Sequence, residues 1–149
     1  MTLMCPDWCR ENCVESMLLD VDGTLRAENA DGFKDKVLLW IDCLKEAGIN
    51  LCLVSNAKQK KVKKIAKELH LPYVADAEKP SSLGLKYAME TWGYNPETTI
   101  MVGDSLKCDI TAAACAGIRS VLVDRIEDKK KNKDDEHEVV YYEWWEEVF

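Results

Sequence analysis

Two carboxylates, one residue apart, follow an apolar run near the N-terminus. Asp20 and Asp22 come directly after the run that ends at Leu19. If this run is a strand, side chains two residues apart point the same way, so both carboxylates lie at its C-terminal end. Crowded carboxylates repel each other and require a cation, a shared proton or water. Gly23 then permits a sharp turn. Asp-Gly is also typical of an ordinary acidic turn after a strand, so this stretch alone leaves both interpretations open.

Further polar groups follow the later apolar runs of the chain. In an open α/β sheet, ligands bind beyond the carboxyl ends of the strands, where such groups converge. This convergence is difficult to explain by solvated turns alone, and it predicts one chemical site. The polar groups in question are Ser55, Lys79, Asp104 and Asp109.

The elements that must position these groups alternate along the chain. Apolar runs predict strands at 14–19, 49–54, 72–74, 99–102 and 119–123. Helical spacing predicts helices at 33–47, 58–69, 81–92 and 106–116, with Ser81 or Ser82 capping the third and glycines at 48, 93 and 117 as stop signals. Strands that alternate with helices indicate βαβ units. The predicted fold is a Rossmann-like three-layer α/β/α sandwich with a five-stranded, mainly parallel sheet.

The composition is that of a single soluble domain. The 149 residues are 47% hydrophobic and 32% charged, and no apolar run approaches the roughly 18 residues of a membrane span. The first twenty residues lack a basic region before a long apolar core, so no secretory signal is predicted and the cytoplasm is expected. We expect one domain over 1–149, with a core at about 14–124 and a charged loop at 124–138. The aromatic C-terminal segment 139–149 is expected to pack back as a helix or to form a partner surface.

The net charge of −7 is unevenly distributed. Its sign argues against nucleic-acid binding. The helix predicted at 58–69 is nevertheless rich in lysine, and its first turn follows Ser55 and Asn56. Lys58, Lys60 and Lys61 would therefore lie near the site, where they could dock a polyanionic ligand or an anionic membrane. The alternative is an ordinary solvated helix face.

Seven cysteines are scattered along the chain. Cys5, Cys9 and Cys13 are spaced by four, which would place them on one face of a helix. This arrangement allows a metal site, a helical packing stripe or free thiols, although the spacing matches no common metal motif.

Taken in their order along the chain, the motifs at the strand ends resemble those of the haloacid dehalogenase superfamily of phosphohydrolases. The stretch Asp20-Val21-Asp22-Gly23-Thr24-Leu25 is similar to its first motif, Ser55 to its second and Lys79 to its third. Gly103-Asp104-Ser105 through Asp109 is similar to its fourth. The resemblance covers about residues 14–124.

The resemblance implies a phosphatase mechanism. Asp20 would attack phosphorus and form an aspartyl-phosphate, and Asp22 would protonate the leaving oxygen and then activate water. Ser55 would hydrogen-bond a phosphoryl oxygen, and Lys79 would offset negative charge. The residues expected to contact phosphate are Asp20, Gly23, Ser55, Asn56 and Lys79; for Asn56, capping of the next helix is the alternative.

The resemblance also implies Mg²⁺ as cofactor, a cation that favours oxygen ligands. Asp20, the backbone carbonyl of Asp22 and Asp104 would bind it, and Asp109 would support this shell. Gly103 would permit close backbone approach.

The intervals between the motifs leave no room for an inserted cap domain. Within the superfamily the chain is similar to the capless subfamily IIIA and its phosphatidylglycerophosphate phosphatase-like branch, through Glu46–Ile49, Val54–Asn56 and Lys79-Pro80. It departs from that branch at Gly23, where asparagine is usual. An open site suits a lipid head group or another bulky phosphorylated substrate. The alternatives are a small-metabolite phosphatase closed by homo-oligomerisation, and a non-catalytic phosphate-binding or interaction protein.

Overall fold

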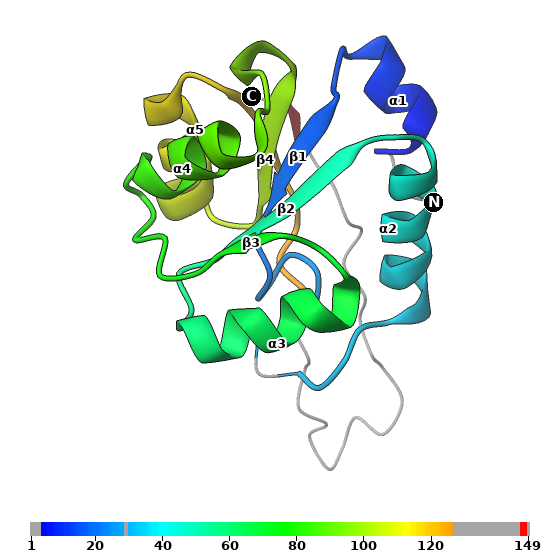
Figure 1. Cartoon of the computed structure of the whole chain (residues 1–149), viewed down its shortest axis with the longest axis vertical. Coiled ribbons are helices and arrows are strands. Elements are labelled where there is room, and N and C mark those ends of the chain that lie inside the picture. The colour runs from blue at the N-terminus through cyan, green and yellow to red at the C-terminus, as the bar shows by residue number, and fades with distance from the viewer. Residues whose placement is uncertain (1–3, 29, 127–146, 149) are drawn as a thin grey trace, which may run out of the picture.

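The chain folds around a single six-stranded sheet (Figure 1). The computed structural model describes residues 4–28, 30–126 and 147–148. The strand order is β3-β2-β1-β4-β5-β6. Every neighbouring pair among the first five strands is parallel, and β6 joins β5 antiparallel. The strands are β1 (Ser16–Leu19), β2 (Asn50–Val54), β3 (Tyr73–Val74), β4 (Thr99–Gly103), β5 (Arg119–Leu122) and β6 (Glu147–Val148).

Helices cover both faces of this sheet, as the three-layer prediction requires. Figure 1 shows α4 and α5 on one side of the strands and α2 on the other. The central strands β1, β2 and β4 are mostly apolar because both of their faces are buried. In β1, Met17 and Leu19 pack with α2 and α3, whereas Leu18 packs with α4 and α5. The helices are α1 (Pro6–Glu11), α2 (Asp35–Glu46), α3 (Gln59–Leu69), α4 (Leu83–Trp92) and α5 (Thr111–Ala116).

Between residues 14 and 123 the predicted helices and strands match the structure in type and order, with three differences of detail. The helix expected at 106–116 begins as a π-helical turn, Leu106–Ile110, and becomes α-helical only at Thr111. A 3-10 turn, Pro96–Thr98, precedes β4. At the start of α4, Ser82 occupies the N-cap position without a capping bond, while Ser81 Oγ accepts from the Leu83 amide (3.3 Å).

The helix predicted for segment 139–149 is wrong at its end. Glu147 and Val148 form the short strand β6 against Leu122 and Val121. An edge strand such as β5 offers unpaired backbone groups, and pairing with them outweighs the local pattern. Residues 139–146 and 149, and 127–138 of the charged loop, lie outside the described residues.

The three N-terminal cysteines do not share a helix face. Only Cys9 lies within α1, where it is buried; Cys5 precedes the helix, and Cys13 follows it with a positive φ and an exposed side chain. None of the three forms a disulfide, and among the described residues they are not part of a group that could hold a metal ion. Among the described helices, none is long and apolar enough to cross a membrane.

Candidate active site

The site lies where the sheet changes winding direction, beyond the carboxyl ends of β1 and β4. These two strands are neighbours at the centre of the sheet, and each is followed by an aspartate of the predicted motifs. Asp20 follows β1 and Asp104 follows β4. Such a switch point is the usual ligand position in a doubly wound sheet.

Three carboxylates meet at this point. Oxygen atoms of Asp20, Asp104 and Asp109 all lie within 4.8 Å of one another. Burial raises the pKa of Asp104 to about 7, and the neighbouring Asp20 carboxylate adds to the rise. Burial also raises the pKa of Asp109, against the opposing effect of Lys79. Both pKa shifts arise mainly from burial, and the neighbouring Asp20 carboxylate adds to them.

Lys79 is the cation within this cluster. Its buried Nζ donates to Asp20 Oδ1 (2.9 Å), Asp109 Oδ1 (2.6 Å) and the Val54 carbonyl (2.8 Å). Burial alone would lower the pKa of Lys79, but the two carboxylates outweigh it and raise the pKa above its usual value. Lys79 therefore carries a charge that fixes Asp20 and Asp109 in place.

The charges of the cluster fit a divalent cation. When all three carboxylates are ionised they carry more charge than the buried ammonium of Lys79 offsets, and the half-exposed Arg125 guanidinium comes only within 3.6 Å of Asp104. Carboxylate oxygens are the ligands that hard divalent cations prefer. Asp20, Asp104 and Asp109 could hold such an ion. The resemblance implies Asp20 and Asp104 as ligands and Asp109 as their support.

Thr24 bridges two of the three carboxylates. Its fully buried hydroxyl lies 3.1 Å from Asp20 Oδ2 and 3.0 Å from Asp104 Oδ1. The residue lies within the first motif, but its type and position alone gave it no role.

Two glycines make room for the carboxylates. Gly23 has a φ of +85°, and a Cβ there would lie 2.5 Å from Asp104 Oδ2. At Gly103 a Cβ would overlap the Asp109 side chain, which confirms the predicted close approach. The turn after β4 also holds the Asp109 side chain, because the Ser105 amide donates to Asp109 Oδ2 (3.2 Å).

The loop after β2 supports the site through backbone contacts. The buried Ser55 Oγ accepts from the Ala57 amide (3.1 Å). The Asn56 side chain accepts from the Lys79 amide (2.7 Å) and donates to the Lys79 carbonyl (3.0 Å). The N-cap of α3 is Lys58, without a side-chain capping bond, so the alternative of Asn56 as its cap is wrong. Asn56 instead ties Lys79 to the end of β2.

Asp22 lies outside the cluster of three carboxylates. Its Oδ2 accepts from Lys61 Nζ of α3 (2.6 Å), and its Oδ1 lies 3.6 Å from Arg26 Nε. The lysine-rich helix thus does reach the site, at Lys61. Lys58 pairs with Asp76 (3.3 Å), and Lys60 is exposed.

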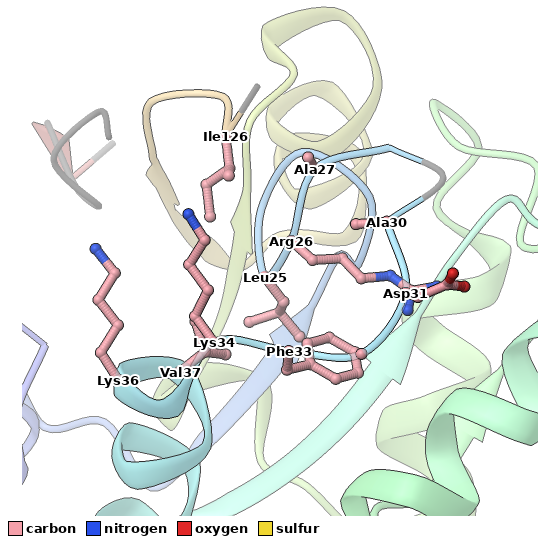
Figure 2. A pocket seen from close by; sticks show the side chains of 11 residues that line it. Leu25, Arg26, Ala27, Ala30, Asp31, Phe33, Lys34, Lys36, Val37 and Ile126 are labelled. Atoms are coloured by element: carbon pink, nitrogen blue, oxygen red, sulfur yellow. The ribbon is translucent and has the colours of Figure 1, made fainter. Parts of the chain in front are cut away.

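A pocket of about 270 Å³ opens beside the loop that follows β1 (Figure 2). Its lining includes Leu25, the last residue of the first motif, and Arg26, and Phe33 and Val37 add apolar surface. Figure 2 shows the side chains of Lys34 and Lys36 on the same side of the pocket as Ile126. The lining is therefore mixed, with apolar walls and basic groups.

Arg125 is a further contact that the sequence pattern did not reveal, because it follows the last motif in what was predicted to be a charged loop. Its Nη1 lies 3.6 Å from Asp104 Oδ2, and its Nη2 donates to Glu28 (2.9 Å). The guanidinium lies at the solvent side of the cluster, since the side chain is half exposed whereas that of Asp104 is buried.

Comparison with known proteins agrees with this geometry. Residues 7–117 match the family model of haloacid dehalogenase-like hydrolases. The chain is 26% identical over 118 residues to the "Probable phosphatase YqeG" of Bacillus subtilis (strain 168), covering 79% of this chain and 69% of that protein.

Solved structures show the same fold. The cobalt-bound deoxy-D-mannose-octulosonate 8-phosphate phosphatase of Haemophilus influenzae superposes with a TM-score of 0.62 at 22% identity, over 75% of this chain and 69% of that one. An uncharacterized protein of Listeria monocytogenes serotype 4b gives a TM-score of 0.62 at 14% identity, over 80% of this chain and 85% of that one. The fold, the acidic cluster and the family match agree: the chain belongs to the haloacid dehalogenase-like hydrolase family.

Proposed function

We propose that this phosphatase is a Mg²⁺-dependent phosphomonoesterase that works through an aspartyl-phosphate. The observation that carries the proposal is the buried contact of Lys79 with Asp20 and Asp109, beside Asp104. This arrangement supplies a carboxylate nucleophile, a fixed positive charge and a divalent-cation site at one point. Phosphoryl transfer needs little more than such positioning and charge neutralisation.

In the first half-reaction, an Asp20 oxygen forms a bond to phosphorus while the bond to the ester oxygen breaks. The electron pair goes to the leaving oxygen, which takes a proton from Asp22. Lys79 holds Asp20 in place. Ser55 and Asn56, at the end of β2, and the Gly23 backbone are proposed to contact the phosphoryl oxygens.

In the second half-reaction, Asp22 takes a proton from water as the water oxygen attacks phosphorus. The bond to Asp20 then breaks, which releases inorganic phosphate and restores the free carboxylate. When bound, Mg²⁺ would neutralise charge on the phosphoryl group. Asp20, the Asp22 carbonyl and Asp104 are proposed as its ligands, and Asp109 as their support.

We extend the proposal to a bulky substrate such as the lipid head group of phosphatidylglycerophosphate, reached by peripheral contact with an anionic membrane. Support comes from the short connections around the site: between Leu25 and Ser55 the chain adds only α2 and β2, and between Ser55 and Lys79 only α3 and β3. No inserted domain covers the strand ends in these stretches, as expected for the capless subfamily IIIA. The mixed pocket beside Arg26 suits a leaving group that is partly apolar and anionic.

The first experiment measures hydrolysis of p-nitrophenyl phosphate with Mg²⁺. Asp20→Asn should lower the rate at least about a thousandfold, because the nucleophile is lost. EDTA should abolish activity, and excess Mg²⁺ should restore it. Full activity of Asp20→Asn would contradict the mechanism.

A second experiment identifies the substrate class. Phosphatidylglycerophosphate in anionic vesicles, sugar phosphates and nucleotides are compared by kcat/KM, together with size-exclusion chromatography. A strong preference for a small phosphometabolite by an oligomer would contradict the lipid proposal and favour a site closed by assembly.

A further inference from the structure

The Asp22 carboxylate is held by a side chain from a distant part of the chain. Lys61 lies in the first turn of α3, which starts just after the loop at the end of β2. Its Nζ is 2.6 Å from Asp22 Oδ2, and its side chain is 38% exposed. The neighbouring lysines do not share this position: Lys58 is 90% exposed and pairs with Asp76, and Lys64 is exposed.

The other oxygen of this carboxylate has no such partner. Asp22 Oδ1 and Arg26 Nε are both buried and lack a hydrogen bond within the described part of the chain, although they lie 3.6 Å apart. The Arg26 guanidinium lies over the Phe33 ring, 5.0 Å from its centroid, and both side chains line the pocket of Figure 2. Arg26 therefore adds positive charge near Asp22, whereas Lys61 supplies the directional hydrogen bond.

We propose that Lys61 is a positioning residue that holds the Asp22 carboxylate for its acid–base role. This inference rests on the proposed function of Asp22. A general acid must lie within hydrogen-bond reach of the leaving oxygen. Asp22 lies on a loop beyond the end of β1, where an isolated β-bridge with Arg26 pairs the backbone but does not fix the side chain. A charged hydrogen bond to a helix packed against the sheet restricts that side chain to one orientation.

The position of Lys61 suits this role better than direct substrate binding. Its ammonium is already engaged by Asp22, and within the described part of the chain it forms no hydrogen bond or ion pair with the three carboxylates that would surround the phosphoryl group. Its loss should therefore impair reactions that need Asp22 and leave the others nearly unchanged.

The test compares Lys61→Met with wild type on two esters of similar shape, phenyl phosphate and p-nitrophenyl phosphate. The value of kcat/KM reports transfer of the phosphoryl group to Asp20, and only the more basic phenolate leaving group needs a proton. Lys61→Met should lower kcat/KM for phenyl phosphate about tenfold, within the range that proton transfer contributes, and change the p-nitrophenyl value much less. Lys61→Arg should restore most of the loss.

A double-mutant cycle separates positioning from a structural effect. In an Asp22→Asn background there is no acid to position, so Lys61→Met should cause no further loss. Lys64→Met is the matched control, because it removes the same charge from an exposed site on the same helix. Thermal melting of each variant checks the fold.

The outcomes separate the positioning role of Lys61 from the proposed function of the site. Four results for Lys61→Met would overturn the positioning role and leave the Asp20 mechanism intact. These are an equal loss of kcat/KM on both esters, a gain, no change, or a loss that persists in the Asp22→Asn background. Wild-type protein that hydrolyses neither ester, or full activity of Asp20→Asn, would overturn the proposed function and this inference with it.

Discussion

One hydroxyl group connects two of the carboxylates at the centre of the site. Thr24 Oγ1 lies 3.1 Å from Asp20 and 3.0 Å from Asp104. Thr24→Val keeps the shape but removes this bridge, so the two carboxylates lose orientation. We expect the Mg²⁺ concentration for half-maximal activity to rise about ten- to a hundredfold, as is usual for groups that orient metal ligands. Metal titration of activity measures this, with Thr24→Ser as the control that keeps the hydroxyl; equal values for all three proteins would contradict it.

The cysteines should differ sharply in reactivity. Burial raises the pKa of Cys9 to about 11, with a smaller contribution from Cys5, and burial raises that of Cys52 to about 12. Both thiols therefore stay protonated and inaccessible, whereas Cys13, Cys43 and Cys115 are exposed. Iodoacetamide at about pH 8 should modify the three exposed thiols of the native protein and spare Cys9 and Cys52, as mass spectrometry would show. In urea all seven should react; fast native modification of Cys52 would contradict the burial.

The sequence identifies the groups that stand at strand ends, and it cannot identify those that reach the site through tertiary packing. Asp20 and Asp104 were predictable because neighbouring parallel strands bring their following residues together. The sequence placed Lys61 near the site, but its pairing with Asp22, 39 positions away, depends on how α3 lies on the sheet. Arg125 depends in the same way on the chain's path after β5.

At the scale of elements, Asn56 joins two loops that follow neighbouring strands. Its side-chain amide forms two hydrogen bonds to the backbone of Lys79, and thereby links the β2–α3 loop to the β3–α4 loop. Asn56→Ala should lower the free energy of unfolding by about 1–2 kcal/mol and reduce kcat, because Lys79 is held less firmly. Urea denaturation and steady-state kinetics test this. Asn56→Asp keeps only the acceptor and should fall between. Unchanged stability with a raised KM alone would show that Asn56 acts only through its proposed phosphoryl contact and that the link to Lys79 has no effect.

The strands and helices were predictable because their apolar spacing matches their burial, as in α3, where Val62, Ile65, Ala66 and Leu69 are all buried. Two features were not. The π-helical turn at 106–110 serves to place Asp109 against Gly103 and Lys79, which is a tertiary requirement. Strand β6 depends on the free edge of β5, which periodicity within residues 139–149 does not encode.

At the scale of the whole molecule, the net charge of −7 does not show where negative charge gathers. The fold concentrates part of it at one point of the sheet. The parallel sheet brings Asp20 and Asp104 together at its centre, and Lys79 offsets only part of their charge and that of Asp109. Folding without a cation should therefore be opposed by these carboxylates. This opposition makes the stability of the metal-free protein depend on pH.

Burial raises the pKa of Asp104 from 3.8 to about 7, and that of Asp109 is raised as well. A carboxyl group with a raised pKa binds its proton more tightly in the folded state, so its contribution to stability is lost as the pH rises from about 4 through 7. In EDTA, the free energy of unfolding should therefore be greater at pH 6 than at pH 8, with a slope of at most about 1.4 kcal/mol per pH unit for each group. Asp104→Asn should flatten this slope, and Mg²⁺ at pH 8 should restore stability to wild type more than to the variant, because the cation binds only the folded cluster. Urea denaturation at both pH values measures these differences; equal slopes for wild type and Asp104→Asn would show that the excess charge is neutralised without a metal ion.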